Sequence, residues 1–236
     1  MSKMKLLIWT IVMIVLASMA VLFFMGTTII DSLQVVGNEH MSRDEILELV
    51  DIYDSSSVLE VMINPINTIE DISYISVLEV EKKDLKNVVI TVHEKDIIGY
   101  VDYMGKYICL DSSGYIVDYT DSPDAKKPKI KGIDLTTFNI NEPMEVSEKI
   151  VLSIDTIYRN ALSFEVPIEW IDFSYGQGNR ITLKIRDIDI KIGDVSRIEE
   201  KFSRIKESLN MLPEGQAGIL YVENLDDNII FKKIEE

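Results

Sequence analysis

Residues 6–25 form an unbroken run of 20 residues without a charged side chain, and this run constrains the chain more than any other feature. A helix of about 20 apolar residues matches the roughly 30 Å hydrocarbon layer of a bilayer. We therefore predict a single transmembrane helix over residues 6–25. Because Lys3 and Lys5 precede the run and Asp31 is the first charge after it, we expect residues 1–5 to be cytoplasmic and the rest extracytoplasmic.

A cleaved signal peptide is the alternative interpretation of the same run. Ser18-Met19-Ala20 has the small-x-small pattern of a processing site. The apolar run nevertheless continues through residues 21–25, and it is longer than a typical signal core of about 7 to 15 residues. The length favours a retained anchor in the cell membrane.

The composition excludes several functional classes. The chain has 40 Asp and Glu residues against 24 Lys and Arg residues, with a formal net charge of −16 at pH 7. Such a surface repels nucleic acid and anionic lipid, so we expect no nucleic-acid partner.

Cys109 is the single cysteine, which excludes an intrachain disulfide, and its apolar surroundings favour a buried thiol over a reactive one.

The first part of a small domain over residues 31–100 is indicated by a strand and a helix start. Residues 32–36 predict a short strand that ends at the Gly37-Asn38 turn. Ser42-Arg43-Asp44-Glu45 has the pattern of a capping box, and a helix to about Tyr53 is expected after it.

The second part of this domain predicts another helix and a hairpin. Asn64 followed by Pro65 is typical of a helix start and predicts a helix over residues 65–73. Residues 74–83 and 87–103 are rich in β-branched side chains and predict an antiparallel hairpin. The expected order is strand, helix, helix, strand, strand, with both helices on one face of a three-stranded sheet.

Residues 101–236 predict a mixed β domain with two amphipathic helices, so the whole chain is assigned to the α+β class. Apolar residues recur at helical spacing over residues 143–162 and 194–212. Residues 118–131, with two prolines, predict a surface loop, whose lysines at 126–131 serve either as a solubilising device or as a contact for anionic polymer or lipid. The predicted strands are residues 105–110, 115–117, 168–173, 180–185, 188–192, 217–223 and 228–233.

The sequence shows no group of residues with the pattern of a catalytic site. His40 and His93 have no neighbouring nucleophile, and the acidic loop around Asp121 lacks the ligand spacing and glycine of a calcium loop. Gly176 and Gly178 lie in a predicted hairpin and do not precede a helix, which argues against a phosphate-binding loop. We therefore predict no catalytic residue, no cofactor and no metal site.

The C-terminal hairpin is the most suggestive binding feature. Its last predicted strand, residues 228–233, has no later strand to cover it. A strand at a sheet edge offers free N–H and C=O groups to which another protein can add a strand. The alternative is that Lys232 and Lys233 protect a solvent edge, or that an earlier strand pairs there.

Several motifs together resemble the FtsQ/DivIB cell-division family. They are the strand and turn over residues 33–38, the helix start over 42–46, the strand over 88–95, and residues 190–193 with the amphipathic helix that follows. Their order along the chain and the predicted anchor carry the resemblance. It implies a polypeptide-transport-associated (POTRA) domain over residues 31–100 and a β domain over residues 101–236.

The resemblance also implies a function. Members of this family are non-enzymatic divisome scaffolds of the cytoplasmic membrane at the division septum. They bind FtsL-like and FtsB/DivIC-like single-span partners and so influence the septal peptidoglycan synthase. In the family a partner binds by strand addition near the end of the β domain, which by position corresponds here to Leu220, Tyr221, Val222, Glu223, Ile229, Ile230, Phe231 and Lys232.

A second hypothesis is an exported sensor or transport-accessory protein. It would use the POTRA-like domain to bind a peptide along residues 32–36 or 74–83. Cell-wall hydrolysis, a third class, needs an acid or metal site that the sequence does not show.

Overall fold

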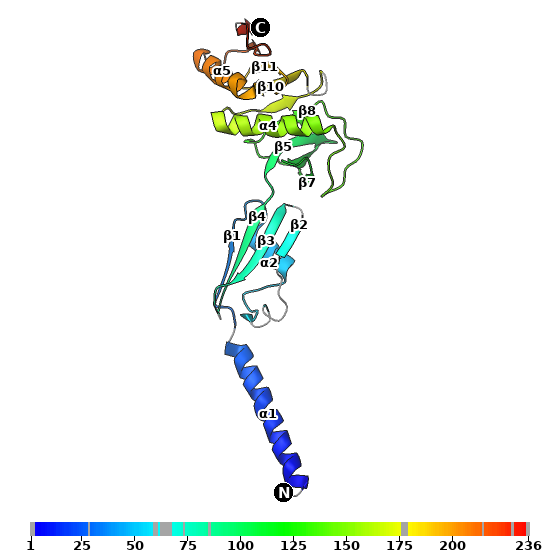
Figure 1. The fold of residues 1–236 in the computed structure, drawn as a ribbon, viewed down its shortest axis with the longest axis vertical. Coiled ribbons are helices and arrows are strands. Elements are labelled where there is room, and N and C mark those ends of the chain that lie inside the picture. Colours follow the sequence, from blue (N-terminus) through cyan, green and yellow to red (C-terminus); the bar gives the residue numbers. More distant parts are fainter. Residues whose placement is uncertain are drawn as a thin grey trace. The chain divides into compact units, whose positions relative to one another are not determined.

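The computed structural model describes residues 3–27, 29–58, 61, 68–72, 74–84, 86–175, 179–213, 215–227 and 229–234. The chain divides into two compact units, residues 1–94 and residues 95–236, which are described separately below. Both contain helices and strands, as expected for an α+β protein (Figure 1).

The predicted transmembrane helix requires a correction. Residues Lys3–Thr27 do form a helix, α1. However, of the helices in the part of the chain that the structure describes, none combines the length and the apolar character that a bilayer crossing demands. The prediction of a single-pass transmembrane helix over residues 6–25 is therefore not supported.

The first unit contains a four-stranded sheet with the order β1-β4-β3-β2. β1 pairs with β4 in parallel, and the other neighbours pair antiparallel. Ile46, Leu47 and Val50 of α2 are buried together with apolar residues of the sheet. The elements are β1 (Ser32–Val36), α2 (Arg43–Val50), β2 (Thr68–Ile72), β3 (Ile75–Lys82) and β4 (Asn87–Glu94).

The start of α2 confirms the predicted capping box. The Ser42 side chain accepts a hydrogen bond from the Glu45 N–H, and the Glu45 carboxylate accepts one from the Ser42 N–H at 2.8 Å. The helix ends earlier than predicted, because Asp51 adopts a left-handed conformation (φ +52°) that closes the last turn.

The second helix predicted for this unit is wrong over the residues that can be compared. Thr68–Ile72 form β2, which pairs antiparallel with β3. Residues 65–67 and 73 of the predicted helix lie outside the described residues. The helix start at Pro65 was a local signal, whereas pairing with β3 is a long-range contact that favours the extended state of the β-branched residues here. The described order is thus strand, helix, strand, strand, strand.

The second unit is built on a nine-stranded sheet with the order β13-β12-β11-β10-β9-β8-β5-β6-β7. The helices α4 (Glu148–Phe164) and α5 (Ile198–Met211) pack against it, and their apolar faces share one core with the strands. The strands are β5 (Ile97–Tyr103), β6 (Lys106–Asp111), β7 (Ile116–Thr120), β8 (Lys129–Lys131), β9 (Trp170–Asp172), β10 (Ile181–Ile185), β11 (Ile188–Gly193), β12 (Gly218–Tyr221) and β13 (Ile230–Lys233).

Two predictions for this region need adjustment. The long strand predicted over residues 87–103 is two strands, β4 and β5, which belong to different sheets. The loop predicted over residues 118–131 is shorter, since Lys129–Lys131 form β8 between β5 and β9. Ile130 is buried and anchors this short strand, while the lysines on either side of it are exposed.

Candidate functional site at the edge of the nine-stranded sheet

β13 is the edge strand of the nine-stranded sheet, and β12 lies between it and β11. β12 runs parallel to β11, with Ile190 opposite Leu220. It runs antiparallel to β13, with Leu220 opposite Phe231. Among the described strands, none pairs with the outer side of β13.

The hydrogen bonds that flank β12 show which way its backbone groups point. The Ile234 N–H donates to the Ala217 C=O at 3.3 Å, on the side of β13. The Val222 N–H donates to the Lys191 C=O at 2.9 Å, on the side of β11. Because backbone groups alternate in direction along a strand, odd-numbered residues of β12 face β13 and even-numbered residues face β11.

The same alternation fixes the direction of the β13 backbone groups. Ile230 lies opposite Tyr221 and Lys232 opposite Ile219, so Ile230 and Lys232 bond inward to β12. The N–H and C=O groups of Phe231 and Lys233 therefore point to the free edge. These two residues carry the backbone groups that a further strand would bind.

The side chains predicted for the site separate onto different faces. Leu220 and Val222 are fully buried in the core. Phe231 of β13 and Ile229, which precedes β13, pack against that core. Ile230 is 53% exposed, and Lys232 and Glu223 are exposed as well. Tyr221 is half-buried, with the Lys232 Nζ 5.0 Å from its ring centroid. Lys233 was not among the predicted site residues, and the hydrogen bonds of Ile234 and Val222 together with the strand pairing identify it.

Gly218 makes room for the Phe231 ring. A Cβ atom at this position would lie 2.6 Å from Cε2 of Phe231 and 2.7 Å from the Lys232 carbonyl oxygen. Both distances are shorter than a carbon atom tolerates, so only glycine lets β13 lie this close to β12. Phe231 thereby holds the edge strand against the core.

The connection between β12 and β13 is fastened to the start of α5. Leu225 is buried in the core, and the Asp226 carboxylate accepts a hydrogen bond from Nη1 of Arg197 at 2.9 Å. Hydrogen bonds to Asp226 and Glu200 raise the pKa of Arg197. The two contacts fix the turn from which the edge strand starts.

A buried lysine supports the neighbouring strand end. Lys201 of α5 is 1% exposed, and its Nζ donates to the carbonyl oxygens of Ile192 at 2.8 Å and Asp194 at 2.9 Å. The Asp194 carboxylate also accepts from Nζ at 3.3 Å, and its pKa is lowered mainly by a hydrogen bond from the Ser196 hydroxyl. Lys201 lies on the apolar stripe of the predicted helix, so its spacing could have indicated burial.

A cell-division protein of known sequence is similar to this chain. The chain is 22% identical over 204 residues to the cell division protein DivIB of Clostridium tetani (strain Massachusetts / E88), and the match covers 81% of this chain and 76% of that protein. This relative belongs to the family that the sequence resembles. The similarity confirms the resemblance seen in the sequence, and it supports a role in cell division.

No protein-family model matches the chain. The solved structure of the major extracytoplasmic domain of the trans isomer of DivIB from Geobacillus stearothermophilus is similar at a TM-score of 0.32 and 14% identity, covering 52% of this chain and 99% of that chain.

The opposite edge of the same sheet differs from β13. At β7, the Ile116 N–H donates to the Glu142 C=O at 2.9 Å, and the Ile116 C=O accepts from the Asn141 N–H at 2.7 Å. The segment around residues 139–144 thus occupies backbone groups of β7. Within the described residues, β13 is therefore the more accessible of the two edges.

His40, for which the sequence indicated no catalytic role, makes contacts that stabilise the fold. His40 donates from Nδ1 to Oε2 of Glu94 at 2.6 Å, and its ring stacks on Tyr74 with centroids 4.9 Å apart. Within the described ranges, no group of three or more His, Cys, Asp or Glu side chains is arranged to hold a metal ion. What the candidate site offers is backbone hydrogen bonding flanked by apolar and basic side chains.

Proposed function

We propose that this protein belongs to the FtsQ/DivIB family and is a non-enzymatic scaffold of the division machinery, which works at the septum in association with the cytoplasmic membrane. Its proposed partners are FtsB/DivIC-like and FtsL-like division proteins, through which it influences the septal peptidoglycan synthase. The relationship to DivIB supports the role in division. The open edge of β13 supports the mode of binding.

The observation that carries the binding mode is the direction of the β13 backbone. Phe231 and Lys233 each turn one donor and one acceptor to the free edge. A partner segment in extended conformation would hydrogen-bond to these groups and become the tenth strand of the sheet. This form of recognition needs no catalytic group.

The side chains along the edge indicate what kind of segment fits. Ile230 and Ile234 are 53% and 49% exposed on one face of the strand, and Lys232 lies between them. A matching segment would carry apolar residues opposite the two isoleucines and an acidic residue near Lys232, since cross-strand pairs of these kinds are favourable. Its remaining side chains would lie over Phe231.

A proline at Lys233 tests the proposal most cleanly. It removes an N–H that points outward, so the β12–β13 ladder keeps its hydrogen bonds. Proline at Tyr221 or Ile230 would remove an inward N–H and disrupt the hairpin itself. The matched control is Lys233→Ala, which loses the same side chain and retains the N–H.

The binding measurement uses the full chain and the DivIC-like protein of the same cell. We expect Lys233→Pro to weaken binding about tenfold, as the loss of one interfacial hydrogen bond of about 1.5 kcal/mol implies. Lys233→Ala should retain most of the affinity. Equal binding by wild type and Lys233→Pro, with thermal unfolding unchanged, would show that the edge is a protected solvent edge.

The alternative function, a sensor or transport-accessory protein, predicts binding along the first unit. β3 lies between β4 and β2, so of the two edges considered for this function only β1 is at the rim of its sheet. The Ser32 N–H donates to the Lys86 C=O, and by alternation the Val35 N–H points outward. Loss of peptide binding in Val35→Pro but not in Lys233→Pro would favour this alternative.

A further inference from the structure

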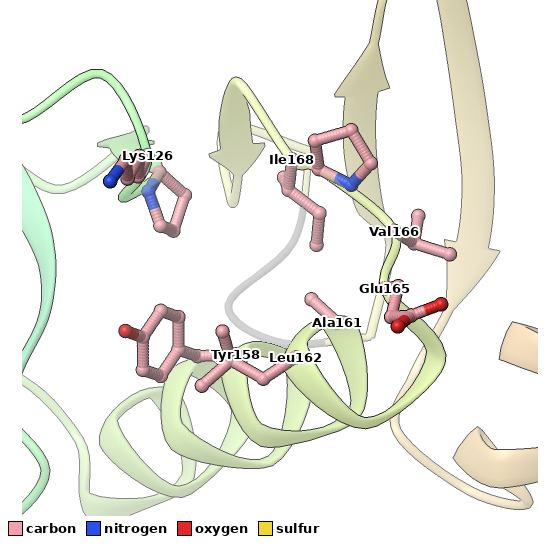
Figure 2. Close-up of a pocket in the computed structure, with 9 residues that line it drawn as sticks. Lys126, Tyr158, Ala161, Leu162, Glu165, Val166 and Ile168 are labelled. Carbon is pink, nitrogen blue, oxygen red and sulfur yellow. The ribbon is translucent and has the colours of Figure 1, made fainter.

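A groove of about 450 Å³ lies between the C-terminal half of α4 and two loop segments that precede β8 and β9. Tyr158, Ala161, Val166 and Ile168 form its apolar floor, and all four are buried. Figure 2 shows these side chains around the opening, with Tyr158 and Ala161 rising from the helix and Ile168 facing them from the loop. The groove is remote from β13 in the sheet order, since β8 and β9 are its neighbouring strands.

The rim of the groove exposes a large apolar side chain. Leu162 lines the groove and is 59% exposed, although the other apolar side chains of α4 that face the core are buried. A leucine beside an apolar groove leaves a continuous apolar surface in water, which marks contact sites more often than a single exposed leucine does.

The two ends of the groove carry opposite charges. Lys126 lies at one end and Glu165 at the opposite end, as Figure 2 shows. Lys126 forms no ion pair among the described residues. The Glu165 side chain is 85% exposed, and its carboxylate pairs with Lys206 at 3.3 Å. Such an exposed ion pair contributes little free energy and is readily exchanged for another partner.

Glu165 also occupies a position that its residue type does not favour. It follows the last residue of α4 in the left-handed conformation (φ +55°), where glycine or asparagine is the usual choice. A glutamate here costs stability, so its presence at the groove is not explained by helix capping.

We propose that this groove is a second docking surface, which binds an amphipathic segment of a partner protein with an acidic residue beside Lys126, a basic residue beside Glu165 and apolar side chains between them. The opposite charges at the two ends define both the composition and the direction of the segment. An anionic lipid would satisfy Lys126 but would bring its apolar tail towards Glu165, which argues for a peptide. This surface adds to the strand-addition edge and does not depend on it.

The probe is a fluorescein-labelled helical peptide of about 14 residues with leucines at i, i+3, i+4 and i+7. Glutamates occupy its first turn and lysines its last turn, which also suits the helix dipole. Two reference peptides replace the leucines by serine or exchange the charged ends. Anisotropy is measured on the full chain, with laurate as a competing amphiphile.

Matched variants of α4 locate the binding. Leu162→Ser removes the rim leucine, whereas Leu152→Ser removes a leucine of the same helix that is equally exposed at 59% but outside the groove. We expect Leu162→Ser to weaken binding about tenfold and Leu152→Ser to leave it unchanged. The double variant Lys126→Glu/Glu165→Lys should prefer the peptide with exchanged ends.

Some results would overturn the proposal. They are the absence of peptide binding, equal loss in both leucine variants, or indifference of the double variant to the direction of the charges. Binding of laurate in place of the peptide would assign the groove to a lipid instead. Lys233→Pro should bind the peptide as wild type does, so a failure here is distinguishable from a failure at β13.

Discussion

Glu94, the last residue of β4, is predicted to stabilise the first unit through a cluster of hydrogen bonds. Its Oε1 accepts from the backbone N–H groups of Glu39 at 2.8 Å, His40 at 3.0 Å and Met41 at 3.3 Å. Its Oε2 accepts from Nδ1 of His40 at 2.6 Å, and the side chain is only 7% exposed. One carboxylate thereby fastens the turn after β1 to the end of β4.

The substitution Glu94→Gln removes the charge and replaces one acceptor oxygen with a donor. The amide nitrogen then faces donors that previously had a partner. Since a hydrogen bond to a charged group contributes about 1.5 to 3 kcal/mol, and at least one is lost, we expect a destabilisation of about 2 to 3 kcal/mol.

The effect depends on pH in a defined direction. Burial raises the pKa of Glu94, but the hydrogen bonds from His40 and from the backbone of residues 39–41 outweigh it and hold the pKa below its ordinary value of 4.5. The unfolded chain therefore binds the proton more readily, and the stabilisation is complete above the unfolded pKa. It is lost as the pH falls through the folded pKa, so wild type and Glu94→Gln should converge in acid.

The assay is native-state hydrogen exchange of peptides that cover β4, which reports opening of the first unit in the full chain. The control is Glu81→Gln on β3, where the carboxylate is 61% exposed and pairs only with Lys83 among the described residues. Near neutral pH, we expect faster exchange in Glu94→Gln and no change in Glu81→Gln. Equal exchange in both variants, or a difference that persists in acid, would refute the reasoning.

Three further substitutions test the packing. Lys201→Met should lower the free energy of unfolding of the second unit by about 2 kcal/mol, because the Ile192 and Asp194 carbonyls lose their donor. The measurement is a urea titration, with Lys206→Met as the control. A Lys201→Met variant as stable as wild type would contradict the prediction. Gly218→Val should cost about 1 to 3 kcal/mol by displacing Phe231, and unchanged chemical shifts in β13 would contradict this. Ser42→Ala should cost about 1 kcal/mol through loss of the helix cap, with Ser32→Ala as a comparison expected to show little change.

Local signals in the sequence predicted local structure well. The capping box at Ser42 is present, and the strands predicted over residues 180–185 and 188–192 are found as β10 and β11. The antiparallel C-terminal hairpin was also anticipated, because alternating β-formers around a short polar turn determine their own pairing.

Features that depend on distant contacts were not accessible from the sequence. β2 stands where part of a helix was predicted from Pro65. Its pairing with β3 stabilises the extended conformation, and this pairing cannot be seen in the local sequence. β8 pairs with β5 and with β9 and so joins two halves of one sheet, but with three residues it is too short to show a strand periodicity in the sequence. His40 and Glu94 are 54 residues apart, and the fold alone brings them together.

The candidate site could likewise be predicted only in part from the sequence. The edge position of β13 was expected, whereas the direction of its backbone groups required the hydrogen bonds of Val222 and Ile234. Those bonds indicate that the outward backbone groups belong to Phe231, which is one of the eight predicted residues, and to Lys233, which is not. Two of the eight, Leu220 and Val222, support the strand from within the core.

Amide exchange in β13, followed by NMR with and without the DivIC-like partner, tests the central claim most directly. In the free protein, the N–H groups of Ile230 and Lys232 should exchange slowly and those of Phe231 and Lys233 quickly. Addition of the partner should protect Phe231 and Lys233 selectively. Slow exchange of these two amides in the free protein, or no change on binding, would contradict strand addition at this edge.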